Sequence, residues 1–202
     1  MRERNYNQNC ALARASDLLG ERWTLLIVRD LLIAPRRFGE LETRLKGMGT
    51  NLLAKRLKDM RLAKLVVGGE ARSSYRLTEM GSALEPMVLQ LVRWSLHWVQ
   101  GTSAPAGLHF PDWDLLALKS LFVPDPKMRS PLVARFEAGD WIAWITIDRQ
   151  CYTFGLGQPN LAPDVLFPCA IPELQTPEPI LSVMNPVMQG KARQLLSCFP
   201  IV

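Results

Sequence analysis

A break in hydrophobic periodicity divides this chain of 202 residues into two halves. The segment QGTSAPAGLHFP, residues 100–111, holds two glycines, two prolines and small polar side chains, a composition typical of a linker. A chain of this length allows one large domain or two small ones. We therefore predict one domain over residues 1–100, a linker over 101–112 and a second domain over 113–202.

Helical spacing of apolar residues dominates the first half. It predicts helices over about residues 11–19, 21–33, 38–45 and 50–60, and we expect Thr50 to be the N-cap of the fourth. Glycine or proline stands between successive helices, where each is expected to end.

A hairpin and a long helix are expected to follow these four helices. The segment LVV, the polar turn GGEARSS and the segment YRL predict two short strands joined by a glycine-rich turn. Thr78 is expected to cap a single apolar helix over residues 79–99. A helix-turn-helix followed by a two-stranded hairpin is a winged helix, so we predict that fold for the first domain.

The fourth predicted helix, TNLLAKRLKDM, has two different faces. Leu53, Leu57 and Met60 share one side, whereas Asn51, Ala54, Lys55 and Lys58 lie on the other. The charged face is either an ordinary solvated surface or a DNA-reading surface, because an amide can read adenine and a lysine can reach phosphate or guanine. Residues 1–100 hold 17 Lys and Arg against 10 Asp and Glu, whereas residues 101–202 hold 7 against 9, and this bias favours an acidic partner such as nucleic acid.

The blocks RWTLLIVRDLL, RRFGEL, LAKRLKDM and YRLTEMG closely resemble the HxlR-type winged-helix transcription regulators. The resemblance covers about residues 10–99. It implies a cytoplasmic bacterial regulator that forms homodimers through its N- and C-terminal helices. It also implies that the fourth helix enters the major groove of double-stranded DNA while the wing touches the flanking backbone.

The resemblance further implies a set of DNA contacts. Arg56 lies at the flank of its helix and could instead pair with Glu40 or Glu42. The implied contacts are Arg36, Arg37, Thr50, Asn51, Lys55, Arg56, Lys58, Arg72, Ser73 and Ser74.

The last helix of the first half is unusually apolar, and two interpretations are open. It can be a core helix of its own domain, or it can be a dimer interface, which we favour because a lone winged helix is too small to bury so many large residues. The expected interface residues are Leu84, Met87, Val88, Leu91, Trp94, Ser95 and Trp98.

Cys10 is a candidate redox site. Members of the resembled family often have Cys-Pro near the first helix, and some sense oxidants or electrophiles there, but Ala11 follows Cys10 in this chain. A position near a helix N-terminus would lower the pKa of the thiol and favour the reactive thiolate. The alternative is a small buried apolar residue.

The second half predicts an α+β domain, an antiparallel sheet covered by helices. A Gly139–Asp140 turn joins the first two strands, and helices are expected over 173–187 and 191–199, separated by Asn185–Pro186 and Gly190. The segments ARFEAGDWIAWITID, PDVLF and GKARQLLSCF resemble the sterol-carrier-protein-like domain, although MQGKAR departs from the expected turn before the last helix. That resemblance implies a cavity for a small apolar ligand, and its candidate lining is Trp141, Trp144, Tyr152 and Phe154, which could equally be plain core.

Other function classes find little support in the sequence. Four scattered cysteines and two histidines argue against a metal site, and we expect no cofactor. We recognise no catalytic motif, so we expect no enzyme. The N-terminus lacks an apolar core and no long apolar run follows, so we expect neither a signal peptide nor a membrane span and predict a cytoplasmic protein.

The rival hypothesis is a small-molecule or lipid-binding protein whose winged helix serves dimerisation or protein interaction.

Overall fold

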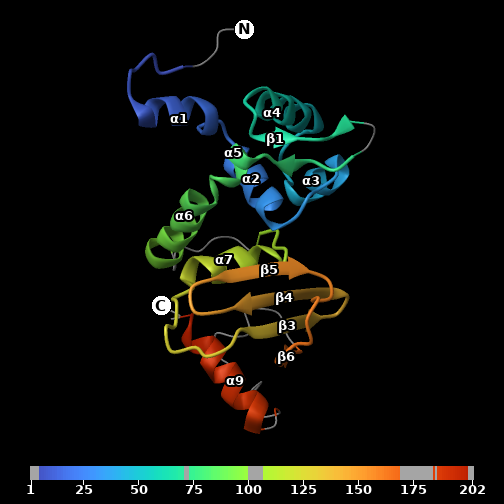
Figure 1. The fold of residues 1–202 in the computed structure, drawn as a ribbon. Helices are drawn as coiled ribbons and strands as arrows, with labels where there is room; N and C mark the ends of the chain where they lie inside the picture. Colours follow the sequence, from blue (N-terminus) through green and yellow to red (C-terminus); the bar gives the residue numbers. More distant parts are fainter. Residues whose placement is uncertain (1–4, 71–72, 100–106, 169–183, 185, 200–202) are drawn as a thin grey trace. The chain divides into compact units, whose positions relative to one another are not determined.

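The computed structural model describes residues 5–70, 73–99, 107–168, 184 and 186–199. The chain forms two compact units, residues 1–88 and 89–202, each with its own helices and sheet (Figure 1). The predicted α+β class is confirmed. The predicted linker lies partly outside the described residues. Among the residues described, no helix is long and apolar enough to cross a lipid bilayer.

The first unit contains the predicted helices in the predicted order. They are α1 (Ala11–Leu19), α2 (Thr24–Ile33), α3 (Phe38–Arg44) and α4 (Thr50–Leu62). The second helix begins three residues later than predicted because Trp23 has a φ of 81°, a left-handed conformation that cannot continue a helix. Gly49, rather than Thr50, is the N-cap of α4.

The hairpin is also present. Strand β1 (Val66–Val67) pairs antiparallel with β2 (Arg76–Leu77). A third segment joins them, since the N–H of Arg36 donates to the carbonyl of Tyr75 at 3.0 Å and the N–H of Tyr75 donates to the carbonyl of Arg36 at 2.7 Å. These pairings attach the wing to the chain just before α3 and complete the predicted winged helix.

Glycine is required where the wing turns. Gly68 has a φ of 95°, and a Cβ built there would lie 2.2 Å from the carbonyl oxygen of Ser74. No side chain fits so close to backbone, so the glycine-rich turn seen in the sequence is dictated by the closeness of the two strands.

The prediction of one helix over residues 79–99 is wrong. The structure has a short helix α5 (Glu79–Ser82) followed by α6 (Glu85–Trp98). Pro86 explains the break, because proline has no N–H and its ring clashes with the carbonyl four residues earlier. The predicted cap is confirmed, since the Thr78 hydroxyl accepts the N–H of Gly81 at 3.0 Å.

The second unit is built on a four-stranded sheet in the order β5-β4-β3-β6. Its elements are α7 (Trp113–Leu121), β3 (Leu132–Ala138), β4 (Trp141–Ile147), β5 (Tyr152–Leu156), β6 (Val165–Phe167) and α9 (Pro186–Ser197). The predicted turn at Gly139–Asp140 joins β3 to β4. The sheet is mixed rather than antiparallel, because β6 crosses over and pairs parallel to β3.

Both helices cover one face of this sheet. Leu115 and Leu118 of α7 and Ala192 and Leu195 of α9 join the buried cluster formed by the strands. Figure 1 shows α7 next to β5 and α9 next to β6. The last helix starts at Pro186, earlier than predicted, since proline is well tolerated in the first turn and Gly190 does not end the helix. The helix predicted over 173–187 lies almost entirely outside the described residues.

Candidate nucleic-acid interface

The two faces of α4 are those that the sequence predicts. Leu53 and Leu57 are fully buried in the first unit, and Met60 joins them. Asn51, Lys55 and Lys58 are exposed on the opposite side. Burial of the leucine side fixes which face meets solvent, and that outer face carries one amide and two cations.

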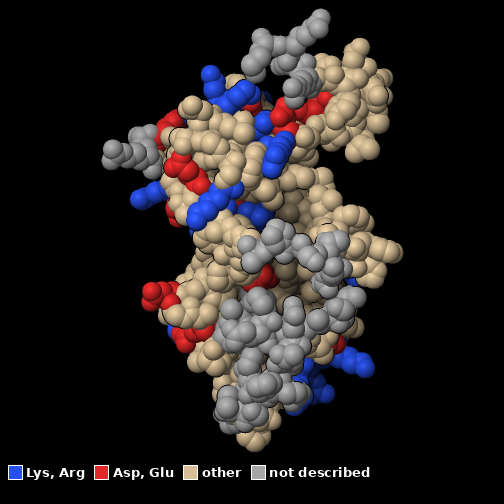
Figure 2. All heavy atoms as spheres, turned by 180° about the vertical axis from the view of Figure 1, so that it is seen from behind, with Lys and Arg blue, Asp and Glu red and all other residues tan. Residues whose placement is uncertain are grey.

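The charges on the outer face of α4 differ in their pairing. The ammonium of Lys55 lies 2.6 Å from a carboxylate oxygen of Asp59, one helical turn away, and both side chains are largely exposed. Lys58 has no ion-pair partner among the described residues. An exposed pair of this kind contributes at most about 1 kcal/mol, so a phosphate could readily displace Asp59. Figure 2 shows the same interleaving of basic and acidic side chains on the first unit seen from behind.

Thr50 and the wing provide further exposed polar groups. The Thr50 hydroxyl donates to the carboxylate of Glu42, which ties the start of α4 to α3. Ser73 is exposed and Ser74 is half-buried, whereas Arg72 lies outside the described residues.

Arg56 does not lie on the exposed face. Its side chain is 9% exposed, and Nη2 donates to Oε2 of Glu21 at 2.8 Å. This burial does not favour the predicted DNA contact at Arg56, and the partner of Arg56 is Glu21 rather than the alternatives Glu40 and Glu42. The reason is that the buried side of α4 is wide enough to include the Arg56 flank.

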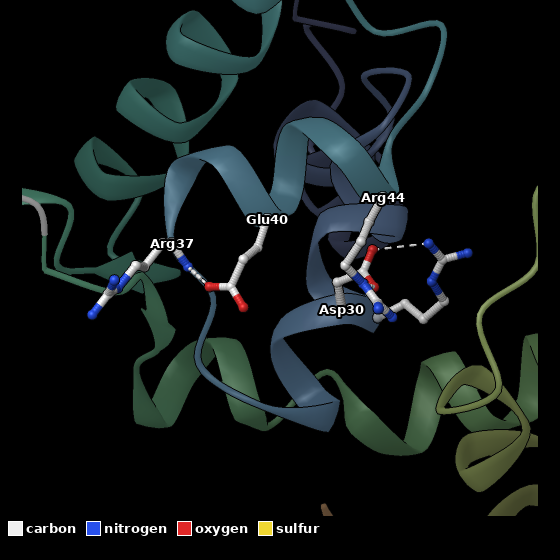
Figure 3. Close-up of polar contacts among 5 residues, drawn as sticks. Asp30, Arg37, Glu40 and Arg44 are labelled. Atoms are coloured by element: carbon white, nitrogen blue, oxygen red, sulfur yellow. Dashed lines mark hydrogen bonds and ion pairs between the residues drawn. The ribbon is translucent and has the colours of Figure 1, made fainter. Parts of the chain in front are cut away.

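The two arginines before α3 have different environments. Arg36 is 9% exposed, and its backbone is paired with Tyr75 in the wing sheet, so we remove it from the predicted DNA contacts. Arg37 is exposed, and its backbone N–H donates to Oε2 of Glu40 at 2.6 Å, which caps α3. Figure 3 shows the Arg37 guanidinium extending away from the other labelled side chains.

A buried ion pair holds α3 against α2. Asp30 is fully buried, and its carboxylate accepts from Nε of Arg44 at 2.6 Å and from Nη2 of Arg29 at 2.9 Å. Figure 3 shows Asp30 and Arg44 meeting between the two helices. This contact explains why a carboxylate lies on the mostly apolar buried side of α2.

Sequence reasoning missed one basic residue of the wing. Arg76 is exposed on β2, between the partly buried Tyr75 and Leu77. The alternation in YRL was the available signal, because neighbouring residues of a strand point to opposite faces. Arg61 pairs with Glu70 and so ties the end of α4 to the wing.

The predicted dimer residues of α6 are mostly exposed. Trp94 is 57% exposed and Trp98 is 69% exposed, and Met87, Leu91 and Ser95 are exposed as well. Leu84 is partly buried. Val88 is buried within its own chain, so it is not available to a partner. Leu12 and Leu18 of α1 are exposed too, which places apolar surface on both helices named by the resemblance.

Cys10 is exposed and immediately precedes α1. Hydrogen bonds from the backbone of Ala13 and then of Leu12 lower the pKa of its thiol. The environment of Cys198 is the opposite, because burial raises the pKa of that thiol. Of these two residues, Cys10 has the environment that favours the thiolate.

The four aromatic residues proposed to line a cavity do not converge. Tyr152 is buried in the core, where its ring lies 5.8 Å from that of Phe122 and 6.0 Å from that of Phe154. Trp141 packs on the same side, but Trp144, opposite Gly155 in the register, lies on the other face of the sheet. The four residues do not line one cavity.

Known proteins resemble the part of the chain that contains the winged helix. The model of the HxlR-like helix-turn-helix family matches residues 18–103. The HTH-type transcriptional regulator YvaP of Bacillus subtilis is 33% identical over 101 residues, which are 47% of this chain and 94% of that protein. The transcriptional regulator YodB of the same organism is 31% identical over 86 residues, 40% of this chain and 77% of that protein.

One solved structure is also similar to part of the chain. The structure of quinone-bound YodB from B. subtilis is 32% identical, covers 42% of this chain and 93% of that one, and has a TM-score of 0.39. This chain matches 94% of YvaP at 33% identity, which is sufficient to assign the family. The chain belongs to the HxlR-like helix-turn-helix family.

Proposed function

We propose that the protein is a dimeric transcription regulator that binds double-stranded DNA through α4 and the wing. The observation that carries the proposal is the outer face of α4, where Asn51, Lys55 and Lys58 are exposed opposite a buried leucine side. The amide can read the edge of an adenine, and the two ammonium groups can reach phosphate or guanine.

The proposed contacts are narrower than those implied by the sequence. Arg36 and Arg56 are excluded because they are buried, and Arg76 is added because it is exposed on the wing. Arg72 stays a prediction. The contacts proposed from described residues are Arg37, Thr50, Asn51, Lys55, Lys58, Ser73, Ser74 and Arg76.

The proposed dimer rests on exposed apolar side chains. Trp94 and Trp98 lie four residues apart and therefore share one side of α6, and the exposed Leu91 lies three residues before Trp94. Exposed tryptophans at helical spacing favour a protein–protein interface, since large aromatic residues are enriched in such surfaces. A second copy of this chain is the proposed partner, and it would present a second α4 to the same DNA.

Selection of DNA from a random pool tests the proposal. We expect the bound fragments to share an inverted repeat, with half-sites about one helical turn, roughly 34 Å, or a multiple of it apart. Sequencing of genomic DNA that co-purifies with the protein should return the same motif. A fragment of residues 1–99, which keeps α6 and lacks the sheet of the second unit, provides a control for any contribution of that sheet. A pool that shows no enrichment, with protein that is folded and dimeric by sedimentation, would refute DNA recognition.

We further propose that oxidation at Cys10 alters DNA binding. The lowered pKa and the exposure of this thiol support the proposal. We expect alkylation of Cys10 to reach half its maximal rate at a lower pH than that of an ordinary free thiol, as measured by mass spectrometry. Mild peroxide should change the DNA affinity of the wild type but not of Cys10→Ser.

Cys151→Ser is the matched control for this experiment, because Cys151 is also exposed but lies in the second unit. That variant should respond to peroxide like the wild type. Equal DNA affinity of the wild type before and after peroxide would eliminate the redox proposal and leave the DNA-binding proposal intact.

A further inference from the structure

The short segment between α1 and α2 contacts the middle of α4. Glu21 lies two residues after the end of α1, and its Oε2 accepts Nη2 of Arg56 at 2.8 Å. The Arg56 side chain is 9% exposed and that of Glu21 is 43% exposed. The pair thus has a buried cationic end on α4 and a half-exposed anionic end on the connecting segment.

Arg56 depends on this one carboxylate. Its Nε is buried and has no hydrogen-bond partner among the described residues. A guanidinium in such a place loses hydration without replacing it, so its charge needs the Glu21 anion. If Glu21 moves, either Arg56 follows it or a buried cation is left without a counter-charge. Both outcomes displace α4 or destabilise its position.

The connecting segment is also strained. Trp23 has a φ of 81°, a conformation that is costly for a bulky residue. Its backbone carbonyl accepts the N–H of Ile27 at 2.9 Å, so the strained residue is fixed to the first turn of α2. A Cβ built on Gly47 would lie 3.7 Å from Cη2 of Trp23, so the indole also lies against the turn before α4. Glu21 therefore contacts α4, and Trp23 lies against the turn that precedes it.

Besides the buried leucine side, two other side-chain polar contacts among the described residues join α4 to neighbouring segments, and neither involves the segment after α1. Thr50 donates to Glu42 of α3, and Arg61 pairs with Glu70 beside the wing. The Glu21–Arg56 pair is the one of these three that connects α4 to the segment after α1. Arg56 lies between Thr50 and Arg61 along the helix, next to Lys55 and two residues before Lys58.

We propose that Glu21 is a positioning residue for α4, and that its ion pair with Arg56 couples the placement of α1 to the DNA-binding face. Glu21 itself does not touch DNA. The inference rests on the proposed function, because the face that it positions is the one assigned to DNA. A movement of α1 would move the connecting segment, and through Arg56 it would change the positions of Lys55 and Lys58.

The test compares Glu21→Gln, Arg56→Gln and the charge exchange Glu21→Arg/Arg56→Glu. We expect either single variant to weaken binding to the selected DNA about tenfold. The salt dependence of binding should stay as in the wild type, because no phosphate contact is removed. The charge exchange should recover most of the lost affinity. Lys191→Gln is the matched control, since it breaks a partly exposed ion pair with Asp164 in the second unit and should leave DNA binding as in the wild type.

Hydrogen exchange supplies a readout that needs no DNA. In Glu21→Gln, amides of residues 50–62 should exchange faster, whereas those of the second unit should keep wild-type rates. Unchanged exchange in α4 together with unchanged affinity would overturn the positioning role. Faster exchange in α4 of a protein whose wild type selects no DNA would instead refute the proposed function and keep the coupling between Glu21 and α4. Uniformly faster exchange throughout the first unit would show general destabilisation and also overturn the specific role.

Discussion

Replacement of Asp30 by Asn is expected to lower the free energy of unfolding of the first unit by about 3–5 kcal/mol. The variant keeps the shape of the side chain but removes the negative charge that Nε of Arg44 contacts at 2.6 Å. Asp30 is fully buried and Arg44 nearly so, so water cannot replace the lost anion. A loss of this size is a large fraction of the roughly 5–15 kcal/mol that stabilises a typical domain.

Urea unfolding followed by hydrogen exchange measures this effect separately in the two units. Amides of α2 and α3 should lose protection, whereas those of β3 and β4 should not. Asp59→Asn is the comparison, because its pair with Lys55 is exposed and should contribute at most about 1 kcal/mol. If Asp30→Asn cost no more than Asp59→Asn, the buried pair would not be what holds α3 against α2.

The double variant Lys55→Ala/Lys58→Ala is expected to weaken DNA binding roughly 50-fold for each bound subunit at 0.1 M salt. Each lysine that contacts a phosphate releases counterions from the DNA, and this release favours binding. The double variant loses the counterion release of both lysines. Both side chains are exposed, so the fold should be unaffected. Fluorescence anisotropy with labelled operator DNA measures the affinity, and circular dichroism checks the fold.

The control for this variant removes the same amount of charge elsewhere. Lys127→Ala/Arg129→Ala changes two exposed cations of the second unit and should bind DNA like the wild type. An equal loss in both double variants would show that only the net charge of the protein matters. Binding by Lys55→Ala/Lys58→Ala equal to the wild type would remove α4 from the proposed interface.

The faces of α4 could be predicted because they depend on local periodicity. Leucines at helical spacing determine which side is buried, and that side is set within a single helix. The partner of Arg56 could not be predicted in the same way. Glu21 is 35 residues away along the chain and sits in a connecting segment, so the pairing depends on how the helices pack. The buried position of Arg36 likewise depends on its pairing with Tyr75 in the wing.

Two errors in the fold have equally specific causes. The apolar pattern over residues 79–99 suggested one helix, but Pro86 separates α5 from α6. Pro86 was visible in the sequence, but the long apolar periodicity favoured the prediction of a single helix. The parallel pairing of β6 with β3 was not accessible, because strand order depends on contacts between distant segments rather than on any local pattern.

The aromatic residues of the second unit show a similar limit. Strand alternation indicates which neighbours share a face, but it needs the correct register across strands. The pairing of Trp144 with Gly155 places it opposite to Tyr152 and Phe154, which pack together in the core. The four residues were chosen because all of them are aromatic, and the structure places them on two different faces of the sheet.

The salt dependence of DNA binding by the wild-type protein tests the central claim most directly. The logarithm of the affinity for the selected site should fall linearly with the logarithm of salt concentration, with a slope of about −0.9 for each phosphate neutralised. In Lys55→Ala/Lys58→Ala the slope should be shallower by about 1.8 for each subunit, if both lysines contact phosphate. A slope that is flat in the wild type, or identical in the wild type and the variant, would contradict the assignment of the outer face of α4 to the DNA backbone.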